Sequence, residues 1–274
     1  MATLGPLHDS PLRHAFPARE VEVGAQSAVE RNWLLAALSD AEYRELSPHL
    51  SSVKLSADQQ LGPPHEDIPL VYFPQSGVVS MIKTMRDGTK VEVGTIGNEG
   101  MSGLAVFLGG DQMPTECVVQ IAGTAKRIHS ATLRQLSGDQ GPLRDVLLCY
   151  TQYLFGQFGQ SVACSTLHSL PQRFARWMLM TRDRVDGDVF AMTHDHLATL
   201  LGVRRAGISE VAEELRRAGG LEYSRGRVRI TDPAALEAMA CECYWTTHED
   251  FQRLLGQFGR RLAIGERRVA PASA

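Results

Sequence analysis

The sequence predicts an α+β fold: an N-terminal antiparallel β-roll (jelly roll), then a long dimerisation helix, then a C-terminal winged helix-turn-helix. Three patterns predict it. Apolar and polar residues alternate between Val53 and Ile128, which indicates strands. From Pro142 apolar residues recur at three- and four-residue steps, which indicates a long helix. The stretch from Thr193 to Ile230 has the pattern of two short helices followed by a hairpin.

Length and composition favour two ordinary domains in a soluble globular protein. The chain has 274 residues, of which 43% are hydrophobic and 22% charged. It shows neither an apolar run long enough for a membrane span nor a secretory signal, so we expect a cytoplasmic protein with no membrane partner. Its five cysteines are odd in number and widely spread, which favours reduced thiols over a disulfide framework.

The domain organisation follows from these patterns. We expect a disordered tail at 1–28, a β-roll sensor domain at 29–137 and a dimerisation helix with a hinge at 138–168. A winged helix-turn-helix domain would then occupy 169–249, and a C-terminal extension 250–274.

The β-roll region opens with two short helices. Asn32 can cap the first and Ser39 the second. About eight short strands are expected between Val53 and Ile128, separated by turn sequences. Among them are Leu70–Phe73 and Val78–Met85 on either side of a turn at Pro74–Gly77, then Leu104–Leu108, Cys117–Ile121 and Thr124–Ile128. Asp87-Gly88 between alternating segments is a strong hairpin signal.

After a short helix capped by Ser130, the long helix is predicted from Pro142 to about Ser165. A stripe of this kind between two domains is typical of a dimer interface. The alternative is that the stripe packs on its own barrel. The stripe consists of Leu143, Val146, Leu147, Tyr150, Leu154, Gln157 and Ser161.

The helix-turn-helix is the most specific signal in the chain. Thr193 caps the first helix, and Gly202 supplies the turn. The second helix would bury Ile208, Val211, Ala212 and Leu215, and a hairpin around Ser224-Arg225-Gly226 would follow. Residues 171–230 contain 11 Arg and 8 acidic residues, although the whole chain has a net charge of −3. This distribution favours nucleic-acid binding by one domain.

Several stretches resemble the Crp/Fnr family of bacterial transcription regulators. They include Val71–Pro74 with Ser76–Ser80, and Val91–Gly94 through Gly97–Met101. Leu201–Arg205, Tyr223–Gly226 and Cys241–Tyr244 resemble one subgroup of that family. The resemblance covers about residues 31–245 and implies a regulator that binds a pseudopalindromic site in double-stranded DNA as a homodimer. RNA polymerase is a further partner that the family suggests.

The resemblance also implies which residues contact DNA. The recognition helix would present its N-terminal residues to base edges in the major groove, with Arg205 on a guanine or, alternatively, on a phosphate. Thr193, His194 and the wing arginines would contact the backbone, which positions the protein without specifying sequence. The candidates are Thr193, His194, Arg204, Arg205, Ser209, Glu210, Arg225 and Arg227.

The sensor departs from the cyclic-nucleotide binders of the family. Those members hold the cyclic phosphate with an Arg where this chain has Pro114-Thr115-Glu116, and Glu116 would repel a phosphate. We therefore expect the fold to be kept and cyclic-nucleotide binding to be lost; a cyclic-AMP- or cyclic-GMP-responsive regulator is the alternative. Residues 1–50 lack the cysteines of iron–sulfur members. The effector-pocket candidates are Glu99, Gly100, Gly103, Leu104 and Thr115.

An enzyme is the competing class, because β-rolls also house cupin metalloenzymes. The strand region offers only His65 and His129 as histidine ligands, which argues against a cupin-like centre, and no catalytic residues are assigned. A final helix is expected to open at Asp232-Pro233, with Leu236, Met239, Ala240 and Cys243 as its apolar positions. Cys241 and Cys243 lie near His248, but two residues apart on this helix they would point to different faces. We therefore expect no metal, no cofactor and no catalysis; a cupin-like small-molecule-binding protein is the remaining alternative.

Overall fold

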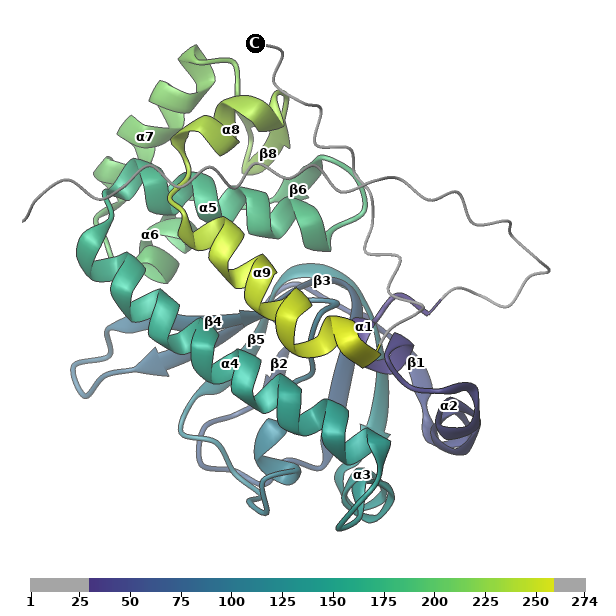
Figure 1. The fold of residues 1–274 in the computed structure, drawn as a ribbon. Helices are drawn as coiled ribbons and strands as arrows, with labels where there is room; N and C mark the ends of the chain where they lie inside the picture. The colour runs from purple at the N-terminus through teal and green to yellow at the C-terminus, as the bar shows by residue number, and fades with distance from the viewer. Residues whose placement is uncertain (1–29, 259–274) are drawn as a thin grey trace, which may run out of the picture.

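The structure is a computed structural model that describes residues 30–258. A β-roll forms one end of the molecule and a helical domain with a small hairpin the other, with two long helices running along one side (Figure 1). The tail expected at 1–28 and the part of the extension from 259 onward lie outside the described residues. The expected α+β architecture is confirmed.

Two short helices precede the roll, and both caps are as expected. The side chain of Asn32 accepts from the backbone of α1 (Trp33–Ala36), and Ser39 forms a capping box with Glu42 at the start of α2 (Asp40–Leu46). Asn32 is fully buried and also donates to the carbonyls of Pro74 and Gly100. A 3₁₀ turn, Ser47–His49, leads into the first strand.

The roll is built from fewer and longer strands than the sequence predicted. Five strands are described in it, in the order β1-β5-β3-β4 with β2 also on β5, and every pair is antiparallel. Pro74–Gly77 was expected to separate two strands but lies inside β3, and β5 likewise joins two expected strands. Residues 104–106 form a 3₁₀ turn, so the strand expected at Leu104–Leu108 is wrong. The strands are β1 (Ser51–Leu55), β2 (Gln60–Gly62), β3 (Leu70–Thr84), β4 (Lys90–Ile96) and β5 (Glu116–His129).

The two long strands are continuous because they bend rather than break. The register of β3 on β5 shifts between Pro74 and Val79. There Gly77 has φ +90°, and a Cβ on Gly123 would lie 2.1 Å from the carbonyl oxygen of Ser76. Glycines at this bulge let the backbones approach closely and turn the sheet on itself.

The interior of the roll is packed with side chains. Phe73, Ile96, Met101 and Ile128 are at most 2% exposed, and they form one core with helices α1, α3 (Ser130–Ser137) and α4 (Pro142–Leu167). The long helix α4 thus begins where the sequence predicted, at Pro142.

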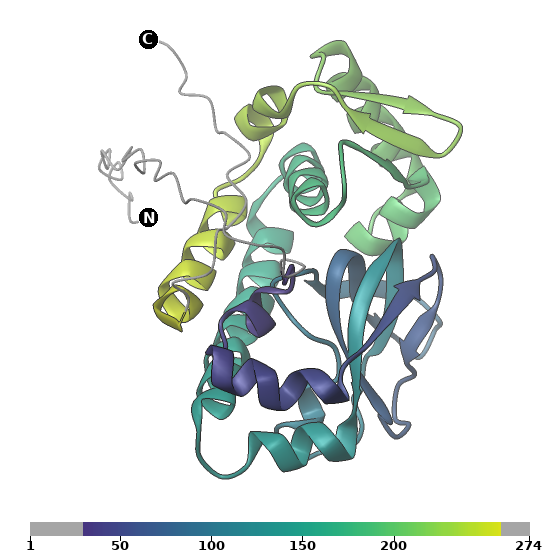
Figure 2. The same ribbon diagram turned by 90° about the vertical axis from the view of Figure 1, so that its right-hand side faces the viewer.

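The last helix differs from the sequence expectation. A helix was expected to run from Pro233 through Cys243, but α8 ends at Met239 and a separate helix, α9, spans Cys243–Leu255. In two views α9 lies alongside α4 (Figures 1 and 2), and its Phe251 packs against Trp33 and Tyr153. Since α9 shares the core of the roll, the boundary expected at residue 249 cuts through it.

The helical domain packs around a second core. It comprises α5 (Leu170–Arg184), β6 (Val189–Ala191), α6 (His194–Leu201), α7 (Arg205–Arg217), β7 (Leu221–Ser224), β8 (Arg227–Ile230) and α8 (Pro233–Met239). Val78, Ile82 and Ile121 of the roll belong to the same core, so the domain is docked on the sheet. Within residues 30–258, no helix is long and apolar enough to cross a membrane.

Candidate nucleic-acid interface

Helices α6 and α7 are joined by a tight turn. Thr193 caps α6 by accepting from the backbone N–H of His196, and Gly202 ends it with φ +65°. Arg204 is the N-cap residue of α7. The predicted stripe of Ile208, Val211, Ala212 and Leu215 is buried, which turns the opposite face of α7 outward.

The outward face of α7 carries the predicted contact residues near its N-terminus. Arg204, Arg205 and Glu210 are exposed. Nε of Arg205 lies 3.3 Å from Oδ1 of Asp195 on α6, and both side chains are about 70% exposed. An ion pair so exposed to water contributes little to stability, so Arg205 can exchange Asp195 for another acceptor.

Ser209 is more engaged than the sequence suggested. Its hydroxyl is 2.9 Å from Nδ1 of His194 and also donates to the carbonyl of Arg205. His194 is half-buried, and burial together with the charge of Arg205 lowers its pKa, which favours the neutral ring. Ser209 therefore joins α7 to the start of α6.

The predicted wing is a two-stranded hairpin. β7 and β8 pair antiparallel through Leu221↔Ile230, and Arg225 and Gly226 between them have φ +49° and +73°. Two positive φ values mark the turn type that suits the twist of a hairpin. Tyr223 fixes the wing to the helices: its hydroxyl donates to the carbonyl of Met192 at 2.8 Å, and its ring packs edge-on against His194. Tyr223 was not among the residues that the sequence predicted for this interface.

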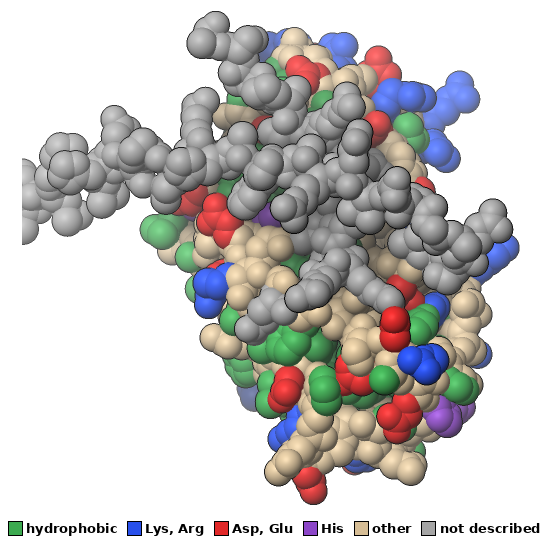
Figure 3. Space-filling model, turned by 45° about the vertical axis from the view of Figure 1, so that its right-hand side comes forward, with side chains coloured by type: hydrophobic (Ala, Val, Ile, Leu, Met, Phe, Trp, Pro, Cys, Tyr) green, Lys and Arg blue, Asp and Glu red, His purple; other side chains and the backbone are tan. Residues whose placement is uncertain are grey.

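The start of α6 lies next to the wing: a Cβ on Gly226 would lie 3.5 Å from Cγ2 of Thr193, and the ring of His194 packs against Tyr223. Basic side chains gather in the upper part of the molecule, at the height of α7 and β8 (Figure 3). In the described part of the chain, ion pairs involve Arg205, Arg216, Arg217 and Arg229 but leave Arg204, Arg225 and Arg227 unpaired. Three arginines therefore offer full positive charge to a polyanion.

The effector-pocket candidates do not line an open cavity. Gly103 and Thr115 border a hollow of about 10 Å³, room for about one water molecule, and its lining holds no charged residue. A Cβ on Gly100 would lie 2.5 Å from the hydroxyl of Tyr150, so this loop is packed on α4. Leu104 is buried.

Glu99 is held by a buried arginine that no motif in the sequence pointed to. Arg184, in the last turn of α5, forms a two-pronged ion pair with it at 3.1 and 2.6 Å and donates to Thr95 at 2.8 Å. Both charged side chains are at most 7% exposed. Gly97 makes the approach possible, because a Cβ there would lie 2.4 Å from Cδ of Arg184. Glu99 thus ties the roll to the helical domain.

A larger hollow, of about 310 Å³, lies between β4, α4, α5 and α6. Arg176 and Trp177 line it, and Trp177 donates to Glu92 at 3.2 Å across the two domains. Burial raises the pKa of Glu92 to about 7.

The stripe predicted as the dimer interface is largely internal. Val146, Leu147, Tyr150, Leu154 and Gln157 are at most 3% exposed in a single chain, while Leu143 and Ser161 are half-buried. These side chains pack on their own roll, so the alternative interpretation of the stripe holds. The opposite face of α4 instead exposes Leu148, Phe155 and Val162, whose spacing of seven was visible in the sequence.

The comparison with family models gives one match. Residues 172–239 match the Crp-like helix-turn-helix domain. A comparison with curated protein sequences finds no match.

Solved structures share the fold over most of the chain. FixK2 from Bradyrhizobium japonicum is 15% identical, with a TM-score of 0.59 over 70% of this chain and 98% of its own. TTHB099, a CRP-family transcriptional regulator from Thermus thermophilus, is 17% identical, with a TM-score of 0.58 over 69% and 96%. The c-di-GMP-responsive regulator CLP from Xanthomonas campestris is 16% identical, with a TM-score of 0.53 over 71% and 100%. Residues 172–239 thus match a Crp-like helix-turn-helix domain, and the chain as a whole shares its fold with these solved structures.

Proposed function

We propose that this protein is a homodimeric, sequence-specific DNA-binding transcription regulator whose β-roll has lost cyclic-nucleotide binding. The observation that carries the proposal is the exposed N-terminal part of α7 beside a wing with unpaired arginines. On this proposal the protein binds rather than catalyses.

The recognition helix would read bases through Arg204, Arg205 and Glu210. Arg205 suits the O6 and N7 atoms of guanine, and Glu210 can accept from the amino group of cytosine. Ser209 would act indirectly, because its hydroxyl already bonds His194 and the backbone. Thr193, Arg225 and Arg227 would contact phosphates, since they lie exposed around the start of α6 and the wing.

A second copy of the chain is proposed on the outer face of α4. Leu148, Phe155 and Val162 are 45%, 68% and 67% exposed and lie seven residues apart on one face of a 26-residue helix. Such an apolar seam favours a parallel helix pair, because pairing removes the apolar side chains from water. The pairing would set two recognition helices about 34 Å apart for a pseudopalindromic operator.

Three features support the loss of cyclic-nucleotide binding. The hollow beside Gly103 and Thr115 is about 10 Å³, far smaller than a nucleotide. No cation lines it to pair with a phosphate. Glu99, which could accept from a ribose, is committed to Arg184.

The proposal is tested with the full-length protein and labelled DNA from the region upstream of its own gene. We expect a shift that depends on sequence and weakens steeply with salt, because arginines displace counterions from phosphates. The proposal of sequence-specific DNA binding would be refuted if the protein bound neither this DNA nor any sequence selected from a random pool in a sequence-dependent way. Titration calorimetry with cyclic AMP and cyclic GMP tests the sensor separately, and micromolar binding of either would refute the loss.

A further inference from the structure

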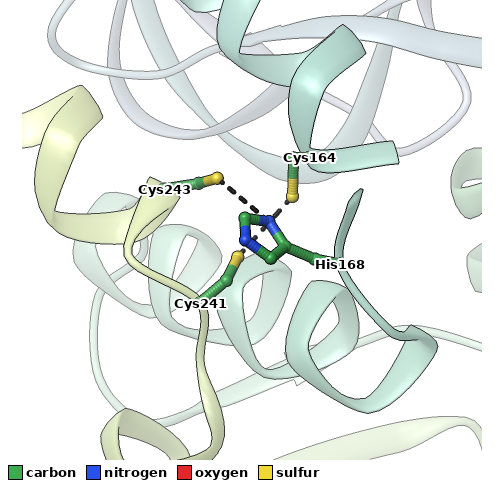
Figure 4. Close-up of side chains that lie close together, drawn as sticks. All are labelled: Cys164, His168, Cys241 and Cys243. Carbon is green, nitrogen blue, oxygen red and sulfur yellow. Dashed lines mark hydrogen bonds between the residues drawn. The ribbon is translucent and has the colours of Figure 1, made fainter. Parts of the chain in front are cut away.

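Three cysteines and a histidine from two distant segments meet at one point. Cys164 lies in the last turn of α4 and His168 directly follows that helix. Cys241 lies between α8 and α9, and Cys243 begins α9. Their sulfur atoms and the imidazole ring point toward one another (Figure 4). Their four ligand atoms all lie within 4.8 Å of one another.

The spacing suits one tetrahedral metal ion. Sγ of Cys164 and Sγ of Cys241 are 3.6 Å apart, and Sγ of Cys243 is 3.4 Å from Nδ1 of His168. Zinc bonds of about 2.3 Å to sulfur and about 2.05 Å to nitrogen give tetrahedral edges of about 3.8 Å between sulfurs and about 3.6 Å between sulfur and nitrogen. The two closest pairs are therefore already within a few tenths of an ångström of such edges.

The cluster does not have the surroundings of ordinary core thiols. Cys164, Cys241 and Cys243 are at most 2% exposed and form a buried group of their own, apart from both hydrophobic cores. The imidazole of His168 brings a nitrogen rather than an apolar group to the sulfurs. Cys149, by contrast, packs against the core of the roll.

Polar neighbours hold the four side chains in place. Nε2 of His168 lies 3.2 Å from the carboxylate of Glu242, which leaves Nδ1 for the sulfurs. Metal-binding histidines usually donate their second ring N–H to such a carboxylate. Gln160 donates to Sγ of Cys243 at 2.9 Å.

The charge around the cluster is also suitable. Three thiolates, one neutral imidazole and a divalent ion carry a net charge of −1. Arg176 of α5 lines the same hollow as Cys164, so a positive charge lies near the cluster. The Nε atom of Arg176 is buried without a hydrogen-bond partner.

We propose that Cys164, His168, Cys241 and Cys243 bind one structural Zn²⁺ ion. Four protein ligands close the coordination shell, which is the mark of a structural rather than a catalytic zinc site. A multi-iron cluster would need its ligands spread over several metal atoms, whereas these converge on one point. The ion would fasten the start of α9 to the end of α4, directly before α5 and the DNA-binding domain.

The test measures zinc in untagged full-length protein, purified under reducing conditions, reconstituted with Zn²⁺ and freed of excess metal. We expect about one zinc ion per chain, by mass spectrometry of the metal. Cys243→Ser should lower the content several-fold. Cys149→Ser is the matched control, since it removes a thiol from α4 outside the site, and it should retain the ion.

Cobalt keeps the test independent of whether the variants fold. Wild-type protein loaded with Co²⁺ should show the visible absorption of tetrahedral, thiolate-bound cobalt, and Zn²⁺ should abolish it. A chelator should lower the melting temperature of the zinc form, and Zn²⁺ should restore it.

Three results would overturn the proposal: no zinc bound after reconstitution, zinc retained in full by Cys243→Ser, or cobalt without thiolate bands. Three free thiols per chain instead of the five in the sequence, counted in denatured unreduced protein, would indicate a Cys164–Cys241 disulfide.

Discussion

The buried pair of Glu99 and Arg184 gives the sharpest test of how the two domains are held together. Arg184→Met would leave the Glu99 carboxylate, whose side chain is 6% exposed, with the backbone N–H of Gly97 as its remaining described donor. Removing one partner of a buried ion pair destabilises a protein by about 3–5 kcal/mol, because an unpaired charge stays in a poorly solvated place. Glu99→Gln should act similarly by stranding Arg184.

A double-mutant cycle separates the pair from mere loss of packing. The Glu99→Gln/Arg184→Met protein should be more stable than the sum of the single changes predicts, by about 1–3 kcal/mol in urea unfolding. Arg182→Met is the control, since Arg182 pairs with a half-exposed Asp188 and its loss should cost at most about 1 kcal/mol. Additivity within about 0.5 kcal/mol would refute the claim that the two side chains act as one clamp.

Three further predictions concern the domain contact, the dimer and the DNA interface. Burial raises the pKa of Glu92 to about 7 from 4.5, so its protonated form favours the fold, and stability should fall by up to about 3 kcal/mol as pH rises from 4.5 to 7. Glu92→Gln should flatten the dependence of the unfolding free energy on pH between pH 4.5 and 7, measured by urea unfolding. An unchanged slope would contradict the assignment of this dependence to Glu92. Phe155→Glu should convert the proposed dimer to monomer in analytical ultracentrifugation, whereas Ala131→Glu, at an exposed position of α3, should not. A dimeric Phe155→Glu protein would exclude this face of α4 as the dimer interface. Arg205→Ala should weaken operator binding by about 1–3 kcal/mol and relax preference at one base pair, whereas Arg227→Ala should weaken all sequences alike and reduce the salt slope by about 1. Uniform weakening by Arg205→Ala would assign Arg205 to phosphate.

The sequence was sufficient to predict those features that depend only on residues close together in the chain. The caps Asn32, Ser39 and Thr193 act on backbone amides within four residues, so their positions fix the helix starts. The turn at Arg225-Gly226 and the buried stripe of α7 are equally local. The helix-turn-helix could therefore be predicted in detail.

Pairing between distant segments could not be predicted in this way. The apolar stripe of α4 does not indicate whether it packs on the roll or on a second chain. In the structure, Tyr150 and Leu154 are buried against the roll. The loop signal at Pro74–Gly77 was misleading because the same residue types make a bulge when a partner strand continues alongside. Arg184 had no visible connection to Glu99, 85 residues away.

The cysteine cluster was missed for a specific reason. Cys241 and Cys243 were assumed to share a helix, where they would diverge, but the chain between Met239 and Cys243 is not helical. A signal was nonetheless present. Cys164 and His168 are four residues apart at the end of a helix, the spacing at which two side chains share one face.

For the proposed regulator, the packed interior of the roll restricts where a small-molecule effector could bind. A ligand shifts a conformational equilibrium only by binding two states differently, and the hollow beside Thr115 has no room for a ligand of nucleotide size. The polar side-chain contacts that hold the helical domain on the roll include Glu99 with Arg184 and Glu92 with Trp177. Both lie along α5, which begins just after His168. On the proposed function, a change at the end of α4 or in the protonation of Glu92 would act on the contact between the roll and the helical domain that carries α7.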